Sequence, residues 1–249
     1  EWVTAKCGIL AGLPPGGPAL ASHHGPVRQT TDRKRERGRA ALPMPVCARH
    51  RLIVAPMISA THRIESGGAN EDRLLVERRG DWTIAIVCDG AGNGGRGAIA
   101  ADLAIAELSR FAGTGFIEWR RGMHAVDQLL ARTAQGGETT CVALAISDQG
   151  YCYGASVGDS GAWMLPRGGP ARELTQQQHR ARLGSGQAWP VAFKAQLMGQ
   201  LLLASDGLFK YIRSTDLLAC AARGVDALID SVRLKSGTLQ DDIAVILLQ

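Results

Sequence analysis

Apolar runs recur along residues 52–249, and their period separates strands from helices. Runs rich in Val, Ile and Leu that end at glycine or at polar turns predict strands, over residues 52–61, 74–78, 82–88, 138–146, 151–157, 162–165, 201–205 and 243–248. Apolar positions three and four residues apart predict helices, over residues 98–111, 117–134, 214–222 and 225–234. Residues 62–69 and 166–199 are polar or rich in glycine, which predicts a loop and a longer flap.

The predicted strands come in hairpins, and pairs of helices separate them along the chain. Short turns at 79–81 and 147–150 join neighbouring strands, which favours antiparallel pairing. Antiparallel sheets combined with grouped helices are typical of the α+β class, in which sheets and helices pack in layers. The sequence therefore predicts one α+β domain over residues 52–249.

The first 51 residues differ from the rest in pattern and in charge. They show no apolar period. They contain nine Lys and Arg against three Asp and Glu, a net charge of +6, which exceeds the net charge of +5 of the whole chain. Their glycines and prolines and the basic run 33–39 predict a disordered or irregular segment. A run of this kind either is a solvated tail or touches nucleic acid or an acidic membrane surface. We interpret it as a solvated tail.

The six cysteines form no CxxC pair and no spacing typical of metal ligands. Four of them lie within apolar runs, which predicts reduced, structural thiols in a cytoplasmic protein. No run approaches the ~18 apolar residues of a membrane span. Prolines interrupt a stretch at 6–22 that otherwise resembles a signal peptide. We therefore expect no membrane partner.

Five aspartates share one kind of position, at a strand end or in a turn beside glycine. The central one is Asp89, which ends the run 82–88 and is followed by five glycines within eight residues. The others are Asp72, Asp159, Asp206 and Asp241. A single aspartate there is usually a turn former, but five would converge at one edge of the sheets if their strands are neighbours. Converging carboxylates repel one another unless cations neutralise them.

Carboxylate ligands select hard cations such as Mg²⁺ or Mn²⁺. Two such ions ~3.5–4 Å apart lower the pKa of a shared water and hold a phosphoryl oxygen. This is the chemistry of hydrolysing a phosphate ester by direct attack of water. The glycine loop after Asp89 would by itself also suit a bound phosphate, but the four other aspartates favour the metal.

Six motifs, in this order, resemble the protein phosphatase 2C (metal-dependent, PPM-type) family. They are Asn70-Glu71-Asp72, Val87-Cys88-Asp89-Gly90-Ala91-Gly92, Gly137-Glu138-Thr139-Thr140, Val157-Gly158-Asp159-Ser160, Ala204-Ser205-Asp206-Gly207-Leu208 and Asp241-Asp242-Ile243-Ala244-Val245. The resemblance covers residues 52–249. Within the family, the sequence is most similar to the bacterial members. It implies an αββα sandwich, with two mainly antiparallel sheets flanked by helix pairs, and a binuclear Mn²⁺ or Mg²⁺ centre.

The resemblance also implies roles for individual residues. The implied metal ligands are Glu71, Asp72, Asp89, Gly90, Asp159, Asp206 and Asp241. Among them, Asp89 would bridge the two ions, and Gly90 would offer its backbone carbonyl. Asp72 would act mostly through water and orient the nucleophile. Asp159 with Asp206 would hold a third, weaker ion, as in bacterial members.

Two features depart from the family pattern. Ala91 stands where eukaryotic members carry a histidine that is a candidate general acid, and bacterial members often lack that histidine too. Glycines stand where a phosphate-binding arginine precedes the Glu-Asp pair. A bacterial subgroup carries a Ser/Thr-His pair in this region, which makes His62 and Arg63 candidates for binding phosphate, with Arg96 as a third. The alternative is that His62 and Arg63 lie on a loop surface.

The sequence thus predicts a Mn²⁺- or Mg²⁺-dependent phosphatase that acts on phosphoserine and phosphothreonine in proteins. Its substrates would be products of a Ser/Thr kinase in bacterial signalling, and it would act as a monomer. The alternative is a catalytically weak or silent domain of the same family that binds a phosphoprotein as a regulator. Ala91 and the missing arginine favour this alternative, whereas the intact aspartates oppose it. A nucleic-acid-binding protein would rest on the run 33–39 alone, so we do not expect nucleic acid as a partner.

Overall fold

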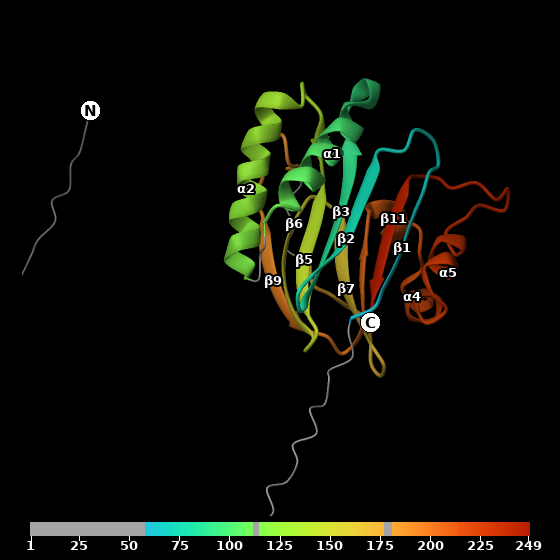
Figure 1. Cartoon of the computed structure of the whole chain (residues 1–249). Coiled ribbons are helices and arrows are strands. Elements are labelled where there is room, and N and C mark those ends of the chain that lie inside the picture. Colours follow the sequence, from blue (N-terminus) through green and yellow to red (C-terminus); the bar gives the residue numbers. More distant parts are fainter. Residues whose placement is uncertain (1–57, 112–114, 177–180) are drawn as a thin grey trace, which may run out of the picture. The chain divides into compact units, whose positions relative to one another are not determined.

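Two antiparallel sheets pack face to face, and helices cover the outer face of each sheet (Figure 1). The computed structural model describes residues 58–111, 115–176 and 181–249. The predicted N-terminal segment, 1–51, lies outside the described residues. Within the described residues, no helix is both long and apolar enough to cross a membrane.

The first sheet has the strand order β2-β3-β5-β6-β9, with the short β4 beside β3. Its strands are β2 (Asp72–Arg79), β3 (Trp82–Ala91), β4 (Glu138–Thr139), β5 (Cys141–Ser147), β6 (Tyr151–Val157) and β9 (Val191–Gln196). Two helices cover its outer face, α1 (Arg96–Leu108) and α2 (Phe116–Thr133). A short 3-10 turn, η1 (Asn93–Gly95), leads from β3 into α1.

The second sheet has the strand order β1-β11-β10-β7-β8. Its strands are β1 (Ala60–Glu65), β7 (Gly161–Pro166), β8 (Arg172–Glu173), β10 (Gly199–Ala204) and β11 (Ile243–Leu248). Three short helices pack on its outer face, α3 (Asp206–Phe209), α4 (Ser214–Ala221) and α5 (Val225–Asp230). All strand pairs in both sheets are antiparallel.

Burial on both faces explains why the central strands are continuously apolar. In β11, Val245 packs toward the helices, whereas Ala244 and Ile246 pack between the two sheets. A strand covered on both sides cannot alternate apolar with polar residues. The core therefore has three apolar layers, one between the sheets and one under each group of helices.

The predicted αββα sandwich is confirmed, and so is the terminal strand 243–248. Two loop predictions are wrong in part. Residues 62–65 belong to β1, an edge strand that pairs with β11 from Ala60↔Leu248 to Glu65↔Ile243. The predicted flap 166–199 contains β8 and all of β9, which pairs with β6. Both errors concern edge strands, which have a neighbouring strand on one side only, and their exposed polar residues resemble a loop.

Other differences lie at element ends. The predicted helix 225–234 stops at Asp230, where the chain turns and the Leu234 amide bonds the carbonyl of Thr238. The helix α3 was not predicted, because a single turn of four residues leaves no apolar period. The predicted strand 52–61 starts at Ala60 among the described residues, and its first six positions lie outside them.

Candidate functional site

Strand ends bring the predicted aspartates to one edge of the two sheets. Asp72 opens β2 directly opposite Asp89 on β3. Asp206 follows β10 as the first residue of α3, Asp159 lies in the turn between β6 and β7, and Asp241 lies just before β11. Carboxylate oxygens of Asp89, Asp159 and Asp206 lie within 4.8 Å of one another. Such a group of oxygen ligands could hold a hard cation.

Asp72 is buried, and a serine fixes one of its oxygens. The Ser205 hydroxyl donates a hydrogen bond to Oδ2 of Asp72 at 2.7 Å and accepts one from the amide of Ala244 at 2.9 Å. Burial raises the pKa of Asp72 to about 7 despite this hydrogen bond, and nearby carboxylates add to the shift. Burial and then the charge of Asp72 raise the pKa of Asp89 to about 8. A negative charge is therefore unfavourable at both positions, and a bound cation would stabilise the ionised carboxylates.

Lys210 supplies a positive charge on one side of the group. Its Nζ lies 2.6 Å from Oδ2 of Asp206 and 3.2 Å from Oδ2 of Asp241. Burial raises the pKa of Asp206, and the hydrogen bond from Lys210 opposes that shift. We did not predict this lysine from the sequence. The available signal was its spacing, because a residue four positions after Asp206 on a helix lies on the same face.

Two glycines let α1 approach β3 at the site. A Cβ on Gly90 would lie 2.4 Å from the carbonyl carbon and oxygen of Gly97, and 2.8 Å from the backbone oxygen of Glu71. A Cβ on Gly97 would lie 2.6 Å from Oε2 of Glu71. Backbone therefore meets backbone here, and the Glu71 carboxylate lies against the first turn of α1.

Asp242 holds the loop between β1 and β2, a role that we also did not predict. Its Oδ1 accepts hydrogen bonds from the Ser66 hydroxyl at 2.8 Å and the Gly67 amide at 3.0 Å. Its Oδ2 accepts one from the Glu71 amide at 2.9 Å. The second aspartate of the Asp241-Asp242 pair thus positions the backbone of Glu71 while the first lies beside Lys210.

The three candidates for phosphate binding lie in different places. Arg63 on β1 pairs with Asp226 of α5 at 2.5 Å and with Glu65 at 3.3 Å, so its guanidinium lies on the α5 side of the second sheet. His62 is exposed on the same edge strand. Arg96 is exposed at the start of α1, between the last two glycines of the glycine loop. The structure therefore does not bring the three side chains together.

The raised pKa values predict that cation-free protein loses stability as the pH rises. Because the pKa values of Asp72 and Asp89 lie near 7 and 8 in the folded chain, against 3.8 ordinarily, the folded state binds more protons than the unfolded state between about pH 4 and 8. We expect the melting temperature in a chelator to fall across this window, and added Mn²⁺ to raise it more near pH 8 than near pH 5, since protons compete with the metal. Calorimetric melting at several pH values measures this. A melting temperature that rises steadily across the window would contradict it.

Solved structures of bacterial serine and serine/threonine phosphatases share this fold. A bacterial serine phosphatase aligns with a TM-score of 0.68 at 21% sequence identity, over 77% of this chain and 97% of that one. The phosphatase Stp1 from Staphylococcus aureus aligns with a TM-score of 0.66 at 20% identity, over 78% of this chain and 96% of that one. The chain therefore has the fold of the bacterial protein phosphatase 2C-type enzymes, as predicted from its motifs.

A third neighbour was solved with metal ions. The catalytic domain of the serine/threonine phosphatase PstP, in complex with two manganese ions, aligns with a TM-score of 0.64 at 18% identity, over 77% of this chain and 97% of that one. No family model and no curated protein matches this sequence. The likeness is thus one of fold, at low sequence identity.

Proposed function

We propose that this chain hydrolyses phosphoserine and phosphothreonine in proteins with the help of bound Mn²⁺ or Mg²⁺. The observation that carries the proposal is the group of Asp89, Asp159 and Asp206, whose oxygens lie within 4.8 Å beside the buried Asp72. Oxygen ligands alone are what Mn²⁺ and Mg²⁺ prefer. The neighbour PstP, solved with two manganese ions, supports the same choice of cofactor.

We propose that the residues at this edge hold two divalent ions and a third, weaker one. We propose as ligands Glu71, Asp72, Asp89, Gly90, Asp159, Asp206 and Asp241. The fit rests on donor atoms that are all oxygen, and on the raised pKa values of Asp72 and Asp89, which burial causes first and neighbouring carboxylates second. Bound there, two cations would lower the pKa of water and stabilise the charge of a phosphoryl group.

The chain's own side chains would orient the reactants. Because Ser205 occupies Oδ2 of Asp72, Oδ1 of Asp72 is left to accept a hydrogen bond from the attacking water. Arg96 is our first candidate for binding phosphate oxygens, since a guanidinium suits them, Arg96 lies in the glycine loop after Asp89, and the other arginine, Arg63, is paired with Asp226. His62 and Arg63 remain hypotheses for the same role. Ala91 supplies no proton, so the leaving alkoxide would take its proton from water.

We take residues 52–249 as the phosphatase domain, acting as a monomer on proteins phosphorylated by a Ser/Thr kinase. Cys88, Cys141, Cys152 and Cys220 are free and buried. Buried free thiols agree with a reducing compartment, so we propose the cytoplasm.

A phosphopeptide assay tests this function. Purified full-length chain with Mn²⁺ should release phosphate from phosphothreonine and phosphoserine peptides, and much more slowly from a phosphotyrosine peptide of the same sequence. Inorganic phosphate is measured directly. No release from any of the peptides, with either Mn²⁺ or Mg²⁺, would contradict the proposal and leave the fold unaffected.

The alternative is a catalytically silent domain that binds a phosphoprotein. One observation favours this alternative. Nζ of Lys210 lies within 3.2 Å of carboxylate oxygens of both Asp206 and Asp241, and so already neutralises their charge. A lysine in this place could substitute for a metal ion. The two functions therefore differ in whether the wild-type chain binds Mn²⁺.

Lys210→Met is expected to tighten Mn²⁺ binding about three- to fivefold. The ammonium competes with a cation for the same oxygens, and partly exposed ion pairs of this kind contribute up to ~1 kcal/mol. Titration calorimetry measures the affinity, and Lys235→Met, at an exposed lysine outside the site, is the matched control. Wild-type protein that binds no Mn²⁺ would favour the silent domain. If Lys210→Met, Lys235→Met and the wild type bound Mn²⁺ with equal affinity, Lys210 would not compete with the cation. That result would leave the proposed hydrolysis untouched.

A further inference from the structure

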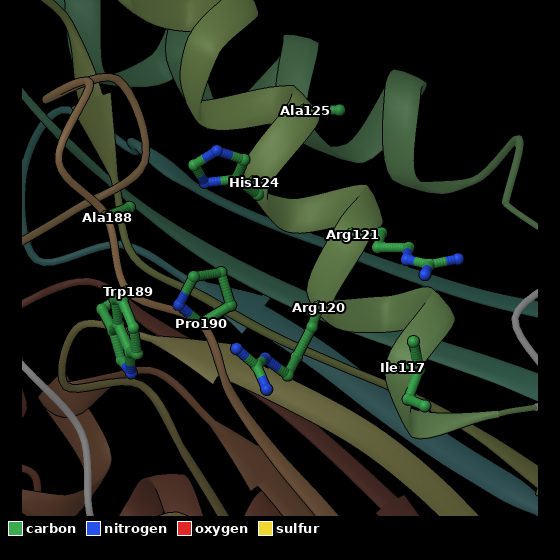
Figure 2. A pocket seen from close by; sticks show the side chains of 8 residues that line it. All are labelled: Ile117, Arg120, Arg121, His124, Ala125, Ala188, Trp189 and Pro190. Atoms are coloured by element: carbon green, nitrogen blue, oxygen red, sulfur yellow. The ribbon is translucent and has the colours of Figure 1, made fainter. Parts of the chain in front are cut away.

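A second feature lies on α2, away from the aspartates. A pocket of about 520 Å³ opens between the first half of α2 and the residues just before β9. Figure 2 shows Arg120 and His124 reaching from the helix toward Trp189 and Pro190, whereas Arg121 points away. No acidic side chain is among the described residues that line this pocket. We call it the α2 groove.

The α2 groove combines exposed apolar surface with positive charge. Trp189 is 61% exposed and Ile117 51% exposed, although both are large apolar side chains. Exposed apolar residues that gather at one place mark interaction sites. Trp and Arg are also the residues that most often dominate binding energy at protein interfaces. The groove therefore has the composition of a protein-binding site.

Buried hydrogen bonds hold the two walls of the groove together. Asp127 of α2 is fully buried, and its Oδ1 accepts the amides of Gly184 at 2.8 Å and Gly186 at 3.0 Å. Its Oδ2 accepts the amide of Ala188 at 3.1 Å, next to Trp189. Since one carboxylate fixes the loop to the helix, the groove is formed before any ligand arrives. A preformed site loses less entropy on binding.

The shape favours a peptide over a small molecule. Small-molecule sites bury most of their ligand, whereas every residue of α2 that lines this groove is exposed. The lining runs from Ile117 to Ala125, and the eight rises between these positions span ~12 Å of helix. An extended segment of about four residues covers that length.

We propose that the α2 groove binds an acidic segment of a partner protein that carries an apolar anchor residue. The anchor would pack on Trp189, and its acidic neighbours would face Arg120 and His124. This binding is separate from the proposed hydrolysis, because none of the carboxylates of the candidate site lines the groove.

Fluorescence anisotropy with a labelled, glutamate-rich peptide that carries phenylalanine anchors tests the proposal on the full-length chain in a chelator. A glutamate peptide without anchors is the reference, since the basic run 33–39 would bind both peptides alike. We expect the anchored peptide to bind more tightly than the reference. Trp189→Ala and Arg120→Glu should each weaken its binding about tenfold, and Trp189→Phe should restore most of it.

Arg132→Glu, the same charge reversal at an exposed position of α2 outside the groove, is the matched control and should leave binding unchanged. Melting curves confirm that each variant is folded. Equal binding of the two peptides, or an anchored peptide that binds Trp189→Ala and Arg120→Glu like wild type, would overturn the proposal. Displacement of the anchored peptide by ATP at equal concentration would also overturn it, in favour of a small anionic ligand.

Discussion

Asp89→Asn is expected to reduce phosphatase activity by roughly 10³-fold, the loss typical when one polar group that stabilises a transition state is removed. Asp89 lies opposite Asp72 and shares its surroundings with Asp159 and Asp206. Asparagine keeps the shape of the side chain but removes the charge that a bridging ligand needs. Hydrolysis of p-nitrophenyl phosphate in saturating Mn²⁺ measures the loss.

The same substitution should make the cation-free protein more stable. Burial and neighbouring carboxylates penalise a charge at position 89, so a neutral side chain removes that penalty. We therefore expect a higher melting temperature in a chelator, together with a smaller gain on adding Mn²⁺. Asp102→Asn, at an exposed aspartate paired with Arg73, is the control and should keep full activity. An Asp89→Asn protein with wild-type activity would contradict the proposed role of Asp89.

Gly90→Ala is expected to destabilise the fold by about 1–3 kcal/mol or more, the usual cost of forcing extra atoms into a packed interior. The added Cβ would lie 2.4 Å from the carbonyl of Gly97, and backbone cannot move aside as a flexible side chain can. Relief requires α1 to shift away from β3, which would also move Glu71. Denaturant unfolding measures the loss of stability, and activity should fall with it.

Gly68→Ala is the matched control, since a Cβ there meets nothing within 4 Å. It should change stability by only a few tenths of a kcal/mol, like other surface substitutions. If Gly90→Ala were as stable as Gly68→Ala, this result would contradict the close contact between α1 and β3 at Gly90 and Gly97.

The sequence predicted the layered α+β fold from its hairpins and grouped helices, and the αββα sandwich from the resemblance of its motifs. The central strands could be located because burial on both faces makes them continuously apolar. Residues 243–248 and 141–147 are almost entirely apolar, and as strands covered on both faces they are buried along their whole length. Edge strands follow a different rule. In the edge strand β9, Lys194 and Gln196 are exposed and polar, so the sequence of β9 alone resembles a loop.

The candidate site was predictable as far as its aspartates, because each adjoins a strand whose end could be located. Lys210 and Asp242 were not, since their roles depend on distances across the fold. Lys210 reaches Asp241 over 31 positions of sequence, and Asp242 reaches Glu71 over 171. The spacing of Asp206 and Lys210 indicates only their own pairing, and no local pattern indicates the contacts with Asp241 or Glu71. For the same reason the sequence could not decide among His62, Arg63 and Arg96.

We propose above all that the aspartates at the strand ends form a divalent-cation centre for phosphate-ester hydrolysis. The most direct measurement is the hydrolysis of p-nitrophenyl phosphate by full-length protein that has been stripped with a chelator and then titrated with Mn²⁺. We expect no turnover in the stripped protein and a return of turnover as Mn²⁺ binds. Turnover that persists unchanged in the chelator, or fully Mn²⁺-loaded protein that hydrolyses nothing, would contradict it.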